Sequence, residues 1–547
     1  MDFQRLFLFL IFSASVFLLF DQWQRERHPV VPATVVSTPA ISTPLVATDA
    51  ANSLTPSVPS VVGAEQKHAS GQKITVKTDW LVAEINTVGG DIRRLKFLQQ
   101  FDAKDRRKPF VLLQEKEAHT YIAQTGLLGS GLPTHNTVFA AQESEYQLTE
   151  DKDTLEVRLL ATDSTAAKVT KVFVFHRGSY LIDVGYEIEN TSIVPVTSSA
   201  YFQLVRDSTT PEGGSKFVPT YTGPAVYTDK EKFQKVDFSD IEKGKVKYPQ
   251  RADNGWIGML QHYFVAAWLP KGNVQREFYT KQLENGLYSA GVVLPIAAIA
   301  PGQSGKISVP LYVGPAQTAL DKIAPGLGLT VDYGWLTIIA TPIFWLLSYL
   351  QGWVHNWGIA IILLTVLIKL AFFPLSAASY RSMGKMRVVA PKLEKIKQQY
   401  GDDRERLHKA MMELYKTEKI NPLGGCLPML IQIPVFIALY WAILASVELR
   451  YAPFFGWITD LSATDPYYVL PLIMGASMVL QTKLNPVPPD PLQAKVMKIM
   501  PVVFSVVFFF FPAGLVLYSI VNSALSIAQQ WYITRGLEAE PKGVAKA

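Results

Sequence analysis

The stretch GIAIILLTVLIKLAFF, residues 358–373, decides the fold of this chain. It contains one charged side chain, Lys369, and neither glycine nor proline after Gly358. Because an α-helix rises about 1.5 Å per residue, a run of this length covers most of the hydrocarbon layer of a bilayer. The stretch therefore predicts a membrane-spanning helix. Its lysine needs a reason, since an ionisable group inside a membrane is costly.

Other apolar segments flank this one. We expect spans at residues 427–447, 467–480, 496–511 and 514–533, the last two separated by Phe511-Pro512-Ala513-Gly514. Residues 1–22 hold a further apolar segment, and because no small-residue cleavage site follows it, we interpret it as an uncleaved N-terminal anchor. The sequence thus predicts an α-helical membrane protein of six spans, five of which form one bundle within residues 358–535.

The composition indicates a second body outside the membrane. Of the 547 residues, 49% are hydrophobic and 18% charged, yet the mean hydropathy is only +0.15, so a soluble part is averaged with an apolar one. Residues 23–70 are rich in Pro, Ser and Thr and predict a disordered linker. The single cysteine, Cys426, excludes an intramolecular disulfide framework.

Residues 71–325 predict a large all-β domain. Apolar and polar residues alternate at 73–77, 155–159, 172–175 and 307–311, which is the two-residue period of a strand with one buried face. Gly89-Gly90, residues 211–214 and Pro301-Gly302 are turn signals. This pattern favours an antiparallel β-sandwich over alternating strands and helices.

Residues 326–357 are expected to contain an amphipathic helix that lies on the outer membrane surface. The segment at 334–352 is apolar enough to pass for a span. However, Trp335, Trp345, Trp353 and Trp357 are typical of the membrane interface, and a better span follows at once. We therefore do not count this segment among the spans.

Lysine and arginine between the spans predict the topology. Residues 376–420 carry a large excess of them: Arg381, Lys385, Arg387, Lys392, Lys395, Lys397, Arg404, Arg406, Lys409, Lys416 and Lys419. We therefore place this segment in the cytoplasm. Alternation of the spans then puts the β domain outside and both termini, including the tail at 536–547, in the cytoplasm.

The same basic segment has helical periodicity. Apolar residues recur every three or four positions, first as Met386, Val389, Leu393, Ile396 and Tyr400, then as Leu407, Met411 and Leu414. These runs predict an antiparallel helical hairpin at residues 376–420. Two interpretations of its charges stay open. They are a solvated face that follows topology, or a docking surface for ribosomes, nascent chains or targeting factors, with Lys385, Arg387, Lys392 and Lys395 as contacts.

Polar side chains within the spans are the candidate functional residues. Snorkelling to the headgroups explains Lys369 alone, and hydrogen bonding between helices explains any single amide or hydroxyl. The last span, however, carries a polar face of Tyr518, Asn522, Ser526 and Gln529 or Gln530, with Ser519 and Ser523 beside it. Taken together, these residues predict a hydrated, positively charged cavity in the membrane, lined by Lys369, Thr365, Gln432, Tyr518, Asn522 and Ser523.

Enzymatic motifs are missing from the sequence. It has no H-E-x-x-H, no G-x-S-x-G, no Walker loop and no histidine cluster of metal-ligand spacing. We therefore expect a protein that is not an enzyme, with no catalytic residue, no metal, no cofactor and no specificity for nucleic acid.

The stretch NPLGGCLPMLIQIPVFIALY, residues 421–440, resembles the signature of the YidC/Oxa1/Alb3 insertases. Further matches are Phe373-Pro374-Leu375, Lys385-Met386, Asp465-Pro466-Tyr467-Tyr468 and residues 511–518. The N-terminal anchor, linker and large outer β domain resemble the branch found in Gram-negative bacteria. The resemblance implies a bacterial inner membrane protein with a periplasmic β domain.

The resemblance also implies a function and a site. Such proteins act as insertases and chaperones for membrane proteins, so nascent membrane proteins, the Sec translocon (SecYEG, SecDF) and the lipid bilayer are the expected partners. Their groove opens to the cytoplasm and has one positive residue in its second span, here Lys369. Many relatives have arginine there, and a lysine keeps the charge without the planar fork. Only Tyr518 of Tyr518-Ser519 matches the pair of aromatic residues common in relatives.

Two other functions stay open on the residues alone. A secondary transporter would use Lys369 as a substrate or ion site, although the chain shows no internal repeat. A membrane-anchored periplasmic binding domain would make the β domain the functional part. We expect the insertase function, because a binding domain would leave the polar groove without a use and a transporter would be expected to show a repeat.

Overall fold

The computed structural model describes residues 71–539, except 103–104, 117–118, 212–220, 402, 419–426 and 486–490. Within these residues the chain divides into two compact units, with the boundary between Gly314 and Pro315. The expected anchor at 1–22 and linker at 23–70 lie outside the described residues, as does the tail from residue 540.

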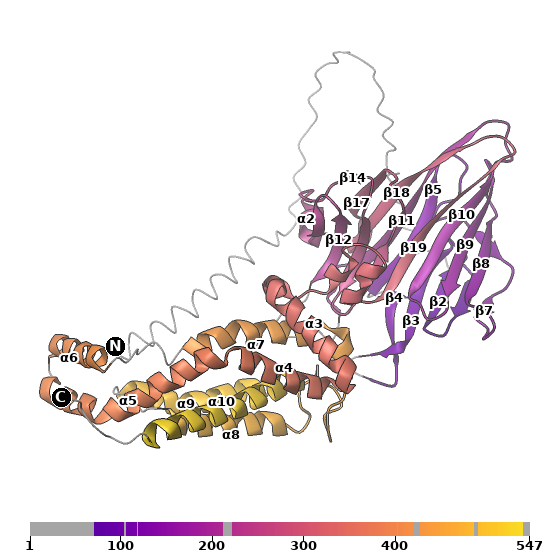
Figure 1. Ribbon diagram of the computed structural model, residues 1–547. Helices are drawn as coiled ribbons and strands as arrows, with labels where there is room; N and C mark the ends of the chain where they lie inside the picture. Colours follow the sequence, from indigo (N-terminus) through magenta and orange to yellow (C-terminus); the bar gives the residue numbers. More distant parts are fainter. Residues whose placement is uncertain are drawn as a thin grey trace, which may run out of the picture. The chain divides into compact units, whose positions relative to one another are not determined.

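The first unit consists of two large sheets (Figure 1). In sheet order, one contains β14 (Arg251–Ala252), β17 (Arg276–Gln282), β18 (Leu287–Ile299), β11 (Val196–Asp207), β5 (His119–Leu128), β4 (Pro109–Lys116), β3 (Asp91–Phe101), β2 (Leu81–Asn86), β1 (Lys73–Lys77) and β7 (Glu145–Gln147). The other contains β13 (Lys232–Lys235), β12 (Thr222–Thr228), β15 (Trp256–Gln261), β16 (Phe264–Trp268), β19 (Ser304–Pro315), β10 (Leu181–Glu189), β9 (Lys168–His176), β8 (Thr154–Ala161) and β6 (Phe139–Ala141). Antiparallel pairing predominates, while β1 and β7 run parallel.

Alternating burial along the strands builds the core between the sheets. In β9, Val169, Phe173 and Phe175 belong to the core and Lys171 is buried on the same face, while Thr170, Val172 and Val174 are more exposed. Large aromatic side chains such as Trp268 join them. The prediction of a large all-β domain is therefore confirmed. Helix α2 (Phe238–Glu242) and the 3-10 turn η1 (Glu284–Gly286) are minor additions.

The turn before β3 needs its two glycines. Gly89 and Gly90 have φ angles of 79° and 58°, a region that favours glycine. A Cβ atom on Gly89 would also lie 2.3 Å from the carbonyl oxygen of His135. The glycine pair that predicted a turn therefore also permits a close approach of two loops.

The second unit is helical. After the 3-10 turns η2 (Thr318–Lys322), η3 (Leu327–Thr330) and η4 (Gly334–Leu336), it contains α3 (Thr337–Val354), α4 (Trp357–Ala371), α5 (Phe373–Tyr400), α6 (Arg404–Thr417), α7 (Leu427–Ala445), the 3-10 turn η6 (Val447–Leu449), α8 (Val469–Leu484), α9 (Pro491–Phe508) and α10 (Ala513–Ala539). Helix α10 packs against α8, α4 and α5, while α3 packs against α4 and α7 (Figure 1). Helix α10 is thus the centre of the bundle.

The expected span at 358–373 corresponds to α4, which ends in a sharp bend. The axes of α4 and α5 differ by 67°, and Phe372 lies between them. Pro374 explains the break, because it has no backbone N–H to continue the hydrogen bonds of α4, whereas the first turn of a new helix does not need one. The bend turns α5 away from the line of α4.

Length and hydropathy support only some of the expected spans. Among the described residues, α3 alone is long and apolar enough to cross a membrane, and α4 with α5 passes as one bent pair. Apolar helices at Gln432–Ala445 and Val469–Leu484 are shorter. Helix α10 continues to Ala539, beyond the expected end of its span at 533. The six-span topology and the interfacial position of α3 stay predictions.

Helices α5 and α6 form a hairpin with its own small core. Val389 and Leu393 of α5 are buried against Tyr415 of α6, and Met386, Met411 and Leu414 pack around them. Asp403 begins α6 by accepting hydrogen bonds from the backbone N–H groups of the next turn. Five of the eight residues expected from the spacing thus belong to this core; Ile396, Tyr400 and Leu407 do not, and Tyr415 was not expected.

Candidate functional site

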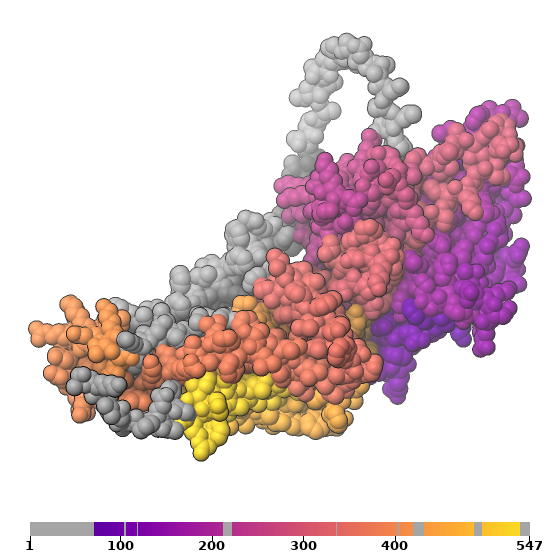
Figure 2. All heavy atoms as spheres, viewed as in Figure 1, coloured from indigo at the N-terminus to yellow at the C-terminus, as the bar shows by residue number. Residues whose placement is uncertain are grey.

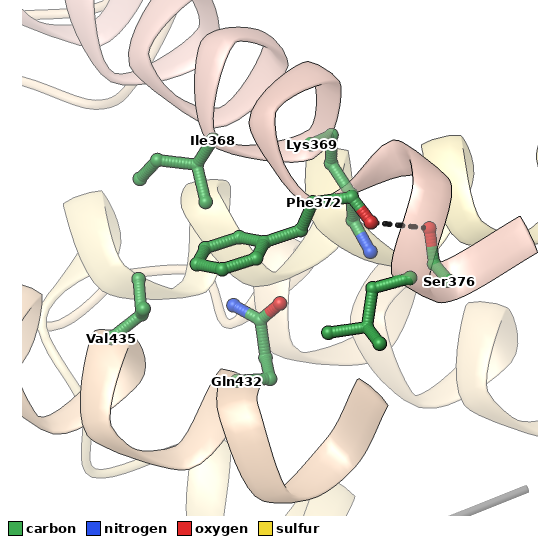
Figure 3. Close-up of a pocket in the computed structure, with 7 residues that line it drawn as sticks. Ile368, Lys369, Phe372, Ser376, Gln432 and Val435 are labelled. Carbon is green, nitrogen blue, oxygen red and sulfur yellow. Dashed lines mark hydrogen bonds between the residues drawn. The ribbon is translucent and has the colours of Figure 1, made fainter. Parts of the chain in front are cut away.

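A hollow lies where α4, α5 and α7 meet, at the bend between α4 and α5. About 370 Å³ of space free of atoms, part of it open to the outside, is lined by Ile368, Lys369, Phe372, Leu375, Ser376, Gln432 and Val435. Figure 3 shows Lys369 and Gln432 reaching toward the same space from opposite helices. Three polar side chains, Lys369, Ser376 and Gln432, thus face a mostly apolar lining.

Lys369 is held inside the bundle. Its Nζ donates a hydrogen bond of 2.7 Å to Oγ of Ser526 on α10, and this hydroxyl donates in turn to the carbonyl oxygen of Asn522. Snorkelling would leave the ammonium group with water and headgroups. The contact with Ser526 instead makes the lysine part of a polar connection between α4 and α10.

Two more hydrogen-bonded pairs join α10 to the helices around the hollow. The amide of Gln432 on α7 donates to the hydroxyl of Tyr518, which is almost fully buried. Ser376 on α5 is hydrogen-bonded to the side-chain amide of Gln529 at 2.9 Å. Sequence reasoning missed Ser376, because the bend between α4 and α5 brings it to the hollow and a helical period does not predict that bend.

The expected cavity residues do not all reach the hollow. Thr365 is fully buried and its hydroxyl donates to the carbonyl oxygen of Ile361 in its own helix. Ser523 faces α8, where its hydroxyl donates to Gln481 at 3.3 Å. Asn522 supplies its backbone carbonyl to Ser526, while its buried side-chain oxygen has no partner among the described residues. Lys369 and Gln432 line the hollow, Tyr518 adjoins it, and Thr365 and Ser523 do not reach it.

The four candidate contacts of the hairpin also differ from one another. Arg387 donates to backbone carbonyls at the end of α8, and Lys392 forms an ion pair of 2.6 Å with Glu418. Lys385 and Lys395 are exposed. Two of the four cations therefore have partners within this unit, which favours a structural role for them. Across the described residues no group of three or more His, Cys, Asp or Glu side chains could hold a metal ion.

Comparison with known proteins identifies the class. The chain matches the model of the YidC periplasmic domain at residues 73–346 and that of the 60Kd inner membrane protein at 349–540. It is 54% identical over 564 residues to the membrane protein insertase YidC of Nitrosospira multiformis, covering 100% of this chain and 99% of that one. The corresponding protein of Methylobacillus flagellatus is 54% identical over 556 residues, which cover 100% of both chains.

A solved structure is also similar. The active YidC insertase with its first transmembrane domain resolved covers 85% of this chain and 93% of its own, at 19% identity and a TM-score of 0.39. The full-length relatives place this chain among the membrane protein insertases. It belongs to the YidC family. The transporter and binding-domain alternatives find no support among these relatives.

Proposed function

We propose that this insertase receives a short polar segment of its substrate in the hollow beside Lys369. The observation that carries the proposal is an ammonium group held within the helical bundle, next to a mostly apolar hollow. An acidic segment is attracted by this charge. Ser376 and Gln432 replace part of the water that its polar groups lose.

The apolar helix of the substrate then passes α7 and α9 into lipid. Two free-energy terms favour this step. The hollow shortens the distance over which polar groups lack water, and partition of the new helix into the hydrocarbon layer supplies the net free energy. Nucleotide hydrolysis is not needed.

We also propose the topology in which this site works. The hairpin of α5 and α6 and both termini lie in the cytoplasm, the β domain lies in the periplasm, and α3 rests on the outer surface of the inner membrane. The basic residues between 376 and 420 and the exposed aromatic side chains of α3 support this arrangement. The hollow then opens toward the cytoplasmic side.

The expected partners follow from this topology. Nascent membrane proteins and the lipid bilayer are required by the function. The Sec translocon (SecYEG, SecDF) would act beside the chain for larger substrates. Ribosomes or targeting factors would meet the exposed cations of the hairpin, Lys385 and Lys395.

Insertion into liposomes that contain only this purified protein tests the proposal. The substrate is a single-span protein with an acidic tail, and protection of the tail from protease measures insertion. We expect Lys369→Gln to lower the rate about ten- to hundredfold, because one interaction with a charged group is typically worth about 1.5–3 kcal/mol. Lys498→Gln, which removes an exposed lysine of α9, is the matched control.

Two outcomes would contradict parts of the proposal. Normal insertion of acidic tails by Lys369→Gln would remove the attraction by charge. No insertion above that of empty liposomes by the unmodified protein would show that it needs the translocon.

A further inference from the structure

The hydroxyl of Ser526 makes two hydrogen bonds within the helical bundle. It accepts from Nζ of Lys369 at 2.7 Å and donates to the carbonyl oxygen of Asn522 at 2.7 Å. A serine hydroxyl has one donor and two acceptor sites, so its donor is used on its own helix and one acceptor site holds the lysine. Ser526 therefore links α4 to α10 through one hydroxyl group.

Burial makes these contacts matter. Ser526 is almost completely buried, and water therefore does not replace a lost partner easily. Alanine at position 526 would leave the ammonium of Lys369 without its described hydrogen-bond partner. Threonine would keep a hydroxyl at the same place.

The contact also limits where the charge lies. A lysine carries its charge on a flexible stem of four carbons and has three N–H donors. One donor is used on Ser526, which leaves two for a group that enters the hollow. Lys369 lacks the rigid fork of an arginine, so a fixed partner on the facing helix does the orienting instead.

We propose that Ser526 is a positioning residue, whose hydroxyl, itself oriented by the carbonyl oxygen of Asn522, holds the ammonium of Lys369 at the hollow for the acidic segment of a substrate. The inference rests on the proposed function of Lys369. It adds that α10 fixes the position of the charge, and that the selectivity for acidic segments depends on a residue that does not touch the substrate.

A double-mutant cycle in the liposome assay tests this proposal. Two substrates are compared that differ only in an acidic or a neutral tail. We expect Ser526→Ala to lower insertion of the acidic tail about tenfold, the typical effect of losing one hydrogen bond to a charged group, and to change the neutral tail little. Ser526→Thr should restore the acidic tail. In a Lys369→Gln background, Ser526→Ala should cause no further loss.

Ser526→Cys and Ser477→Ala complete the set. Ser526→Cys keeps the shape of the side chain but replaces the hydroxyl by a weakly hydrogen-bonding thiol, so it should lower the ratio of acidic to neutral insertion in the same direction. It still tests the proposal where Ser526→Ala folds poorly. Ser477→Ala removes a hydroxyl of α8 that donates to the carbonyl oxygen of Met474 in its own helix. It should leave the ratio unchanged.

Several results would overturn the inference. Equal losses for both tails, or an equal loss in the Lys369→Gln background, would make Ser526 a merely structural residue, as would failure of threonine to restore selectivity. If Lys369→Gln itself inserts acidic tails normally, the proposed role of the charge fails first, and this result is distinct from a failure of Ser526.

Discussion

The guanidinium group of Arg387 on α5 donates hydrogen bonds to the backbone carbonyl oxygen of Leu484, the last residue of α8, and to that of Lys483. The last carbonyls of a helix have no partner within it, and a cation there also interacts favourably with the helix dipole. Gln530 on α10 donates to the same carbonyl of Leu484 at 3.1 Å. The end of α8 is thus held from two helices.

We expect Arg387→Ala to loosen this contact. Because Arg387 is partly exposed, its removal should lower the local stability of the end of α8 by only about 0.3–1 kcal/mol. Amides in the last turn of α8 should then exchange with solvent about two- to fivefold faster. Hydrogen exchange of the full chain in nanodiscs measures this. Arg381→Ala, which removes an exposed cation from the same helix, is the control. Unchanged exchange at the end of α8 would show that the hairpin is held by other contacts.

A buried ion pair joins the two sheets of the β domain. Nζ of Lys171 lies 3.9 Å from Oδ1 of Asp91 and donates to the carbonyl oxygen of Gly89 at 2.9 Å, while the two side chains are 1% and 0% exposed. Lys171→Met should destabilise the domain by about 3–5 kcal/mol, because it leaves a buried charge unpaired. Combining it with Asp91→Asn should recover part of the loss.

The temperature at which the β domain of the full chain becomes sensitive to protease measures this cost. Lys168→Met is the matched control, because it removes a cation from the same strand whose ion pair with Glu189 is exposed. That pair should contribute less than about 1 kcal/mol. If the two substitutions lowered this temperature equally, the buried pair of Lys171 and Asp91 would not contribute more to stability than the exposed pair.

The same pair should give the β domain a pH dependence. Burial raises the pKa of Asp91 from 3.8 to about 7, because the loss of solvation outweighs the attraction of Lys171. A raised pKa means that the folded state holds the proton more tightly than the unfolded state. The resulting stability is fully present below about pH 4 and is lost as the pH rises toward 7.

Protease sensitivity measured from pH 4 to pH 7.5 tests whether the stability of the β domain falls as the pH rises. Asp91→Asn should remove most of the fall in stability over that range. Asp153→Asn changes a carboxylate that is 99% exposed and should keep the dependence of the unmodified protein. A slope that survives Asp91→Asn would assign the pH dependence to other groups.

The position of α3 is testable by labelling. Ile338 and Trp353 are 88% and 73% exposed near the two ends of this helix. In a chain whose Cys426 is replaced by alanine, single cysteines at either position should react with an impermeant maleimide added from outside, because an interfacial helix lies along one surface. A spanning helix would expose one end only. Residue 531 lies toward the C-terminal end of α10, which the proposed topology places at the cytoplasmic side. A single cysteine from Trp531→Cys should therefore react with the maleimide after the membrane is permeabilised. Figure 2 shows the side chains of α3 at the surface of the second unit.

Periodic patterns in the sequence predicted the two kinds of fold. Alternation at 73–77 and 172–175 predicted strands that are β1 and part of β9, because one face of each strand is buried. Helical spacing of Val389, Leu393 and Leu414 predicted the packing of α5 on α6. These patterns are local, and each depends only on which side of an element faces away from water.

The sequence by itself determined the two-part composition, the helical and β classes, the family signature at residues 421–440 and the polar face of the last helix. Only the tertiary structure decided which neighbouring side chain each polar residue of that face contacts. Ser526 turns to Lys369, Tyr518 to Gln432 and Ser523 to Gln481. Which neighbour a polar group meets depends on the packing of helices far apart in the chain, and on the 67° bend that brings Ser376 beside the hollow. A helical period shows which residues share a face, but it carries no information about what stands opposite them.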